Sequence, residues 1–162
     1  MVFYLTIFYL PQFLIFYIII FIILSIEDGL ASDSVIRFLD SKSEDYAAMS
    51  KTIWSLAELG YQEKETSKLM QSHLKEENFS IDSGVAEIPT AFIASYGSGK
   101  PIIAILAEMD ALPGLSQDAK PERKIIKEGM PGHACGHHLF GAGSIAAAVA
   151  VKNWLIETGA TG

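Results

Sequence analysis

Cysteine is almost absent from this chain, which has one, Cys135, in 162 residues. A single cysteine cannot form an internal disulfide, and it excludes a c-type haem attachment motif, which needs two. Basic residues are also scarce, with 12 Lys and Arg against 19 Asp and Glu and a net charge of −7. Because phosphate binding requires a basic surface, this balance disfavours nucleic acid as a partner.

Charge is missing from the whole N-terminal segment, where the first charged residue is Glu27. The almost continuously apolar run from Val2 to Leu24 is long enough to cross a bilayer as a helix. No Lys or Arg precedes it, and it exceeds the usual apolar region of a signal peptide. We expect residues 1–26 to be a membrane anchor or an uncleaved signal, with cleavage near Gly29-Leu30-Ala31 as the alternative.

This segment predicts a membrane-anchored or exported protein, periplasmic or extracellular. If a misplaced start codon prepended the segment, the protein would be cytoplasmic. Internal repeats are absent, and Gly97-Ser98-Gly99-Lys100 lacks the spacing and the Ser or Thr of a phosphate loop. We therefore expect residues 32–162 to form one domain of modest size.

Hydrophobic spacing and turn residues predict an α/β order of elements in residues 32–162. The expected elements are a helix from Ser32 or Ser34 to about Leu59, a helix over Glu65–Asn78, strands over Phe79–Val85, Ala91–Tyr96 and Pro101–Ala107, a loop over Leu112–Met130, and a helix over Gly141–Glu157. The last helix opens with Ala, Gly and Ser, so we expect it to approach a neighbouring element closely.

The uninterrupted apolar run Pro101–Ala107 predicts a strand buried on both faces. Carboxylates at the end of such a strand stand where α/β sheets place their sites. Alternation puts Glu108 and Asp110 on the same side. A solvated strand end is the structural alternative.

Three of the four histidines and the only cysteine lie within six residues, in Gly132-His133-Ala134-Cys135-Gly136-His137-His138. Such ligands gathered tightly favour a metal site over a buried free cysteine beside loop histidines. Cys135 and His137 can share one ion only if the segment is not helical, and its glycines favour that. His138 should point away from His137 or cap the following helix.

The motifs Ala107-Glu108-Met109-Asp110-Ala111-Leu112-Pro113 and Gly132-His133-Ala134-Cys135-Gly136-His137 resemble those of metal-dependent amidohydrolases related to aminoacylase and carboxypeptidase G. The likeness runs from about Ser34 to Gly162 and is strongest to the members that use aminobenzoyl-glutamate. It implies the N-terminal part of a metallopeptidase-type catalytic domain, a central sheet flanked by helices, without the family's lid and dimerisation domain.

The resemblance also implies a function and a site. It implies hydrolysis of an amide bond in a small N-acyl amino acid, two Zn or Mn ions, and a homodimeric full-length parent. Cys135 and His137 would be metal ligands, and Asp110 the catalytic-site acid that orients the metal centre. Glu108 stands where many relatives carry a ligand histidine, and His138 where Asp or Asn is common, so neither residue takes a role from the resemblance.

The family's general-base Glu and its remaining ligands match no residue of this sequence, so we expect weak metal binding and no turnover from these 162 residues. Two alternatives remain open at this stage. One is a cysteine-nucleophile hydrolase in which Cys135 attacks and a histidine acts as base. The other is a non-catalytic membrane-anchored fragment.

Overall fold

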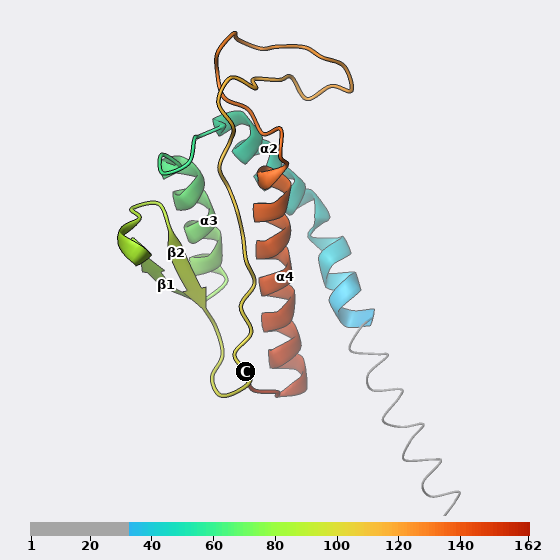
Figure 1. The fold of residues 1–162 in the computed structure, drawn as a ribbon. Coiled ribbons are helices and arrows are strands. Elements are labelled where there is room, and N and C mark those ends of the chain that lie inside the picture. The colour runs from blue at the N-terminus through green and yellow to red at the C-terminus, as the bar shows by residue number, and fades with distance from the viewer. Residues whose placement is uncertain (1–32) are drawn as a thin grey trace, which may run out of the picture.

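The computed structural model describes residues 33–162, so the hydrophobic segment 1–26 lies outside the described residues. Four helices and a two-stranded sheet make a mixed α/β arrangement (Figure 1). After a helical stretch over 33–41 come α2 (Ser43–Leu56), α3 (Lys64–Glu76), β1 (Ser80–Ser83), a short 3₁₀ turn (Val85–Glu87), β2 (Phe92–Ser95) and α4 (His137–Thr158).

The first predicted helix is divided in two. A turn at Lys42 separates residues 33–41 from α2, and Ala57, with a left-handed φ of 43°, ends α2 before the expected helix end at about Leu59. The second helix is confirmed within two residues of its expected ends. Its first turn is capped from outside the helix, because the Glu58 carboxylate accepts hydrogen bonds from the backbone N–H groups of Glu65 and Thr66.

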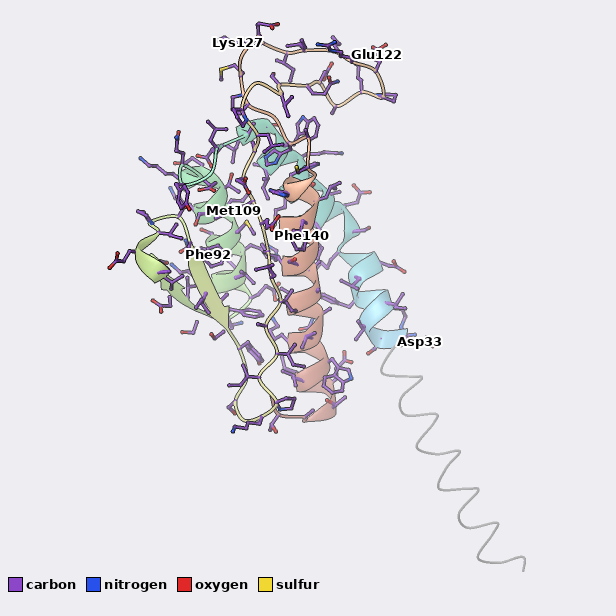
Figure 2. The ribbon with its side chains drawn as sticks, in the orientation of Figure 1. Asp33, Phe92, Met109, Glu122, Lys127 and Phe140 are labelled. Atoms are coloured by element: carbon purple, nitrogen blue, oxygen red, sulfur yellow. The ribbon has the colours of Figure 1, made fainter. Side chains whose placement is uncertain are left out.

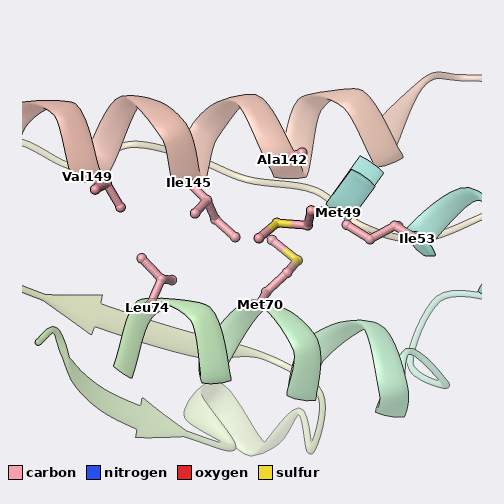
Figure 3. Close-up of a cluster of buried hydrophobic side chains, with 7 residues drawn as sticks. All are labelled: Met49, Ile53, Met70, Leu74, Ala142, Ile145 and Val149. Atoms are coloured by element: carbon pink, nitrogen blue, oxygen red, sulfur yellow. The ribbon is translucent and has the colours of Figure 1, made fainter. Parts of the chain in front are cut away.

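Seven buried side chains from three helices form the core. α4 lies against both α2 and α3, and its small and branched residues meet the methionines of the other two helices (Figure 3). The cluster consists of Met49, Ile53, Met70, Leu74, Ala142, Ile145 and Val149. Among residues 33–162, α4 alone is long and apolar enough to cross a membrane, and its place in this core gives that apolarity a structural cause.

The two strands pair antiparallel, with Ser80 opposite Ser95 and Ser83 opposite Phe92. Both strands are confirmed, each one or two residues shorter at its ends than the sequence predicts. The expected third strand is wrong: residues 101–107 run as an extended segment alongside α4 with no assigned strand (Figure 1). The expected burial is also wrong, because Ile102 is 84% exposed and Ile103 is 77% exposed.

Segment 101–107 is not a strand because a β-strand requires backbone hydrogen bonds to a neighbouring strand. Within residues 33–162, no strand is paired with segment 101–107; an apolar groove lies between it and β2, lined by side chains that include Ile93, Ile103, Leu106 and Val151. A hydrogen bond from Ser144 Oγ to the carbonyl of Leu106, 2.7 Å long, joins the segment to α4. The central sheet of the predicted fold is therefore present only as the β1–β2 pair in the described residues.

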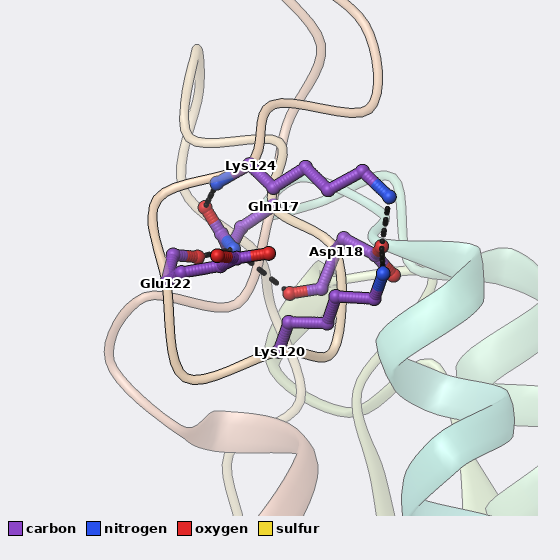
Figure 4. Close-up of polar contacts among 5 residues, drawn as sticks. All are labelled: Gln117, Asp118, Lys120, Glu122 and Lys124. Atoms are coloured by element: carbon purple, nitrogen blue, oxygen red, sulfur yellow. Dashed lines mark hydrogen bonds and ion pairs between the residues drawn. The ribbon is translucent and has the colours of Figure 1, made fainter.

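The predicted loop is confirmed, since residues 112–130 contain neither helix nor strand. Its outer part, with Glu122 and Lys127, projects beyond the ends of the helices (Figure 2). Gln117 organises this part: its Nε2 donates to the carbonyl of Glu122 at 2.7 Å and its Oε1 accepts from the backbone N–H of Lys124 (Figure 4). The Lys124 ammonium pairs with Asp118 at 2.9 Å, and the exposed charges here make a solvated loop, as expected.

Candidate metal centre

Two backbone pairings bring the acidic end of segment 101–110 to the Cys/His motif. Leu112 and Gly132 exchange both of their backbone hydrogen bonds at 3.0 Å, and the backbone N–H of Ala111 donates to the carbonyl of Glu58 at 2.7 Å. Gly132 is required at this crossing, because a Cβ there would lie 2.0 Å from the carbonyl oxygen of Leu115. The two ends of loop 112–130 therefore lie side by side, and the candidate residues flank these two ends.

The Cys/His motif is a turn that runs directly into α4. Gly136 has a left-handed φ of 81° and precedes the first helical residue, His137. The helix therefore begins four residues earlier than the expected Gly141, because the glycine supplies the change of direction at its start. Cys135 lies on the turn and is exposed, whereas His137 and His138 lie in the first turn of the helix.

His137 lies between two carboxylates. Asp110 Oδ1 is 2.8 Å from Nδ1 of His137, and Glu108 Oε2 is 2.8 Å from Nε2. The prediction that Glu108 and Asp110 share a side of their segment is confirmed, because both reach the same imidazole. The His137 side chain is 21% exposed, so the cluster is partly shielded and open on one side.

His133 and His138 belong to a different, buried cluster. His133 Nε2 donates to the carbonyl of Ile53 at 3.0 Å, and the His138 ring packs edge-on against Trp54 with centroids 4.8 Å apart. Burial lowers the pKa of both histidines from its ordinary value, and the neighbouring His133 lowers that of His138 further. The first of the two alternatives for His138 is confirmed: its ring packs with Trp54 and His133 and not with the acidic cluster, and it lies inside α4 and does not cap it.

The donor chemistry around His137 fits a divalent cation, since imidazole, carboxylate and thiol groups are the usual protein ligands of zinc. Asp110 on Nδ1 supplies the carboxylate partner that metal-binding histidines normally have on their second nitrogen. The number of donors falls short: in residues 33–162 no three His, Cys, Asp or Glu side chains are arranged to hold one ion. The two carboxylates meet opposite nitrogens of the ring and so cannot bind the same ion as arranged.

Sequence reasoning missed the partner of His137 at Nε2. The motif resemblance assigns Glu108 no role, although its position two residues before Asp110 is the signal that both carboxylates reach one place. Sequence reasoning also gives no site contact to Trp54, which packs near His133 and His138 although it lies far from them in the chain.

No protein-family model matches the chain. Individual curated proteins do. A subunit of the p-aminobenzoyl-glutamate hydrolase of Escherichia coli is 41% identical over 133 residues, which cover 79% of this chain and 28% of that protein. The human Xaa-Arg dipeptidase is 29% identical over 72% of this chain and 26% of its own length.

A third relative is the IAA-amino acid hydrolase ILR1-like 5 of Arabidopsis thaliana, 38% identical over 60% of this chain and 22% of its own length. The matches thus span about a quarter of the length of these relatives. The relatives are named for hydrolysis of amide or peptide bonds in small molecules, which agrees with the resemblance seen in the motifs. This chain belongs to the family of amidohydrolases and carboxypeptidases that includes the p-aminobenzoyl-glutamate hydrolase of E. coli.

Proposed function

We propose that this chain is the metal-binding N-terminal part of a metal-dependent amidohydrolase that cleaves an N-acyl amino acid of the aminobenzoyl-glutamate type. The observation that carries the proposal is the contact between Asp110 and Nδ1 of His137, 2.8 Å long, at the end of the extended segment 101–110. The similarity to a component of a p-aminobenzoyl-glutamate hydrolase supports the choice of substrate class.

Each residue has a separate part in the proposal. The Asp110 carboxylate would accept a hydrogen bond from Nδ1–H of His137 and so leave Nε2, which faces Glu108 in this structure, as the ligand atom. Cys135, exposed on the turn two residues earlier, would supply a sulfur ligand. A zinc or manganese ion held by these residues would polarise the scissile carbonyl and acidify a bound water.

The described part of the chain offers too few metal ligands for catalysis by this route. A catalytic zinc site normally takes three protein ligands, and no such set is arranged in residues 33–162. We therefore propose that the 162 residues alone do not turn over substrate, and that hydrolysis belongs to a longer protein that contains them. Homodimer formation and membrane attachment stay predictions from the sequence.

A chimera tests the proposed activity. The matching region of this chain, 79% of its length, would replace its counterpart in the E. coli relative, and the complete hydrolase would be assayed with p-aminobenzoyl-glutamate. We expect hydrolysis that a chelator abolishes and that His137→Ala in the grafted region removes. A chimera that folds, as judged by circular dichroism, and yet hydrolyses nothing, or works equally well with His137→Ala, would refute the proposal.

A further inference from the structure

A groove of about 340 Å³ runs along one face of α3, and none of its lining residues belongs to the candidate metal centre. Pro89 and Thr90 line it from the turn before β2. Its helical side consists of residues that recur every three or four positions and so share one face of the helix: Lys64, Ser67, Lys68, Gln71, Ser72 and Lys75. The groove is therefore a second concave site, built mainly by α3.

Positive charge gathers in this groove although the chain is acidic. Its lining includes Lys64, Lys68 and Lys75 and no acidic residue, whereas the whole chain has 19 Asp and Glu against 12 Lys and Arg. Within residues 33–162, none of these three lysines forms an ion pair. Lys64 and Lys68 are one helical turn apart, where like charges repel. A bound anion would relieve this repulsion.

The acceptor groups on the wall of the groove already have partners. Ser67, only 3% exposed, donates through Oγ to the carbonyl of Thr90 at 2.7 Å and accepts from Nε2 of Gln71 at 2.9 Å. Gln71 Oε1 accepts from Ser83 Oγ at 2.7 Å. The buried Glu63 is also engaged, because it accepts from Thr90 Oγ1 at 2.8 Å. The groups left for a ligand are chiefly donors, the three ammonium groups above all, and donors match an anion.

The lysines also indicate which anion fits. Arginine offers the planar fork that matches a carboxylate, and the groove has none. A lysine ammonium is a compact charge with three donors, and a phosphate group presents three acceptor oxygens. Lys64 and Lys68 are about 6 Å apart along the helix axis, and Lys75 is about 10 Å further on. The row therefore suits more than one phosphate group, and its volume is that of a small-molecule site.

We propose that this groove binds a small soluble molecule that carries two or more linked phosphate groups. The site is separate from the candidate metal centre, and the proposal does not depend on the proposed hydrolytic function. Three lysines on one helix face make no extended basic surface, and the net charge of −7 disfavours nucleic acid as the source of the phosphates.

Titration of the 162-residue chain with inorganic pyrophosphate, followed by ¹H–¹⁵N NMR of the backbone amides, tests the site. Pyrophosphate should shift the amide resonances of α3 and of the turn at Thr90, and the shifts should saturate. Lys68→Gln should raise the dissociation constant about tenfold, the usual worth of one hydrogen bond to a charged group. Lys68→Arg keeps the positive charge and should retain most of the affinity.

Two controls separate a built site from general attraction of anions. Lys51→Gln removes the same charge from an exposed position inside α2, outside the groove, and should leave the dissociation constant unchanged. Citrate carries a similar charge at neutral pH on carboxylates instead of phosphates, and it should bind more weakly than pyrophosphate.

Three results would overturn the proposal. The first is the absence of a saturable shift in α3, or shifts centred instead on the basic residues of loop 112–130. The second is an equal loss of affinity in Lys68→Gln and Lys51→Gln, which would show that only net charge matters. The third is citrate binding as tight as that of pyrophosphate. None of these results bears on the activity of the chimera, which tests the proposed function separately.

Discussion

Gly141 of α4 packs on the backbone of Glu108, and a Cβ at this glycine would come within 2.8 Å of the Glu108 carbonyl oxygen and 3.3 Å of Met70 Cε. This contact joins the core to the candidate metal centre. The helix whose first residue is His137 is seated, one turn later, on the residue that faces His137 Nε2. The distance between His137 and Glu108 therefore depends on the lack of a side chain at Gly141.

Gly141→Ala should destabilise the protein by about 1–3 kcal/mol, because the added methyl group forces the helix away from segment 101–110. Gly143→Ala is the matched control in the same helix, where a Cβ meets nothing within 4 Å. It should stabilise the protein by about 0.5–1 kcal/mol, the usual gain of alanine over glycine in a helix. Urea denaturation measures both; equal changes in the two variants would contradict the close packing at Gly141.

Glu58→Gln should cost about 1 kcal/mol at neutral pH, because Glu58 caps the start of α3 through two backbone N–H groups. Burial on its own raises the pKa of Glu58, but the hydrogen bonds from Thr66 and Glu65 hold it below its ordinary value of 4.5. A lowered carboxyl pKa stabilises the folded state above pH 4.5, and that contribution is lost as the pH falls.

The stability difference between wild type and Glu58→Gln should therefore hold at neutral pH and shrink as the pH falls below 4.5 through the lowered pKa of Glu58. Urea denaturation at a series of pH values measures it. A difference that stays constant across this range would show that the capping does not depend on the charge of Glu58.

Ile103→Thr should make the 162-residue chain less prone to self-association without loss of helix content. The apolar side chains of segment 101–107 are exposed, and an exposed apolar patch promotes association. Sedimentation velocity and circular dichroism measure the two quantities. Ile53→Thr, at a fully buried core position, is the contrasting variant and should lower stability instead.

Cys135 should react readily with a thiol reagent in the folded protein, because it is exposed and is the only cysteine in the chain. If it is a metal ligand, saturating Zn²⁺ should slow the reaction in the wild type. The same addition should have little effect in His137→Ala, where the second ligand is gone. Identical rates with and without Zn²⁺ in the wild type would argue against Cys135 as a ligand.

The helices and the β1–β2 hairpin are predictable from local patterns because their hydrophobic spacing and end residues are encoded nearby in sequence. For example, Gly159 ends α4 in a left-handed conformation, two residues after the expected helix end at Glu157. The small residues of α4 also predict a close approach, which occurs at Gly141. In contrast, the break at Lys42 and the end of α2 at Ala57 have no clear local signal.

The prediction of a buried strand over residues 101–107 was wrong for a different reason. Its apolar run encodes the capacity to be a buried strand, but pairing depends on what lies beside it, and no local pattern contains that information. At the site, alternation correctly placed Glu108 and Asp110 together, whereas their meeting with His137 depends on the Leu112–Gly132 pairing across the loop. The candidate residues follow from local motifs, and only the fold determines their contacts.

Elemental analysis of the E. coli chimera carrying this chain's matching region tests the central claim most directly. The account predicts at least about one Zn or Mn per chain, as expected when the ligands of a metal site are present, and a reduced content in the His137→Ala chimera. A folded chimera with no such metal, or with the same metal content after His137→Ala, would contradict the account.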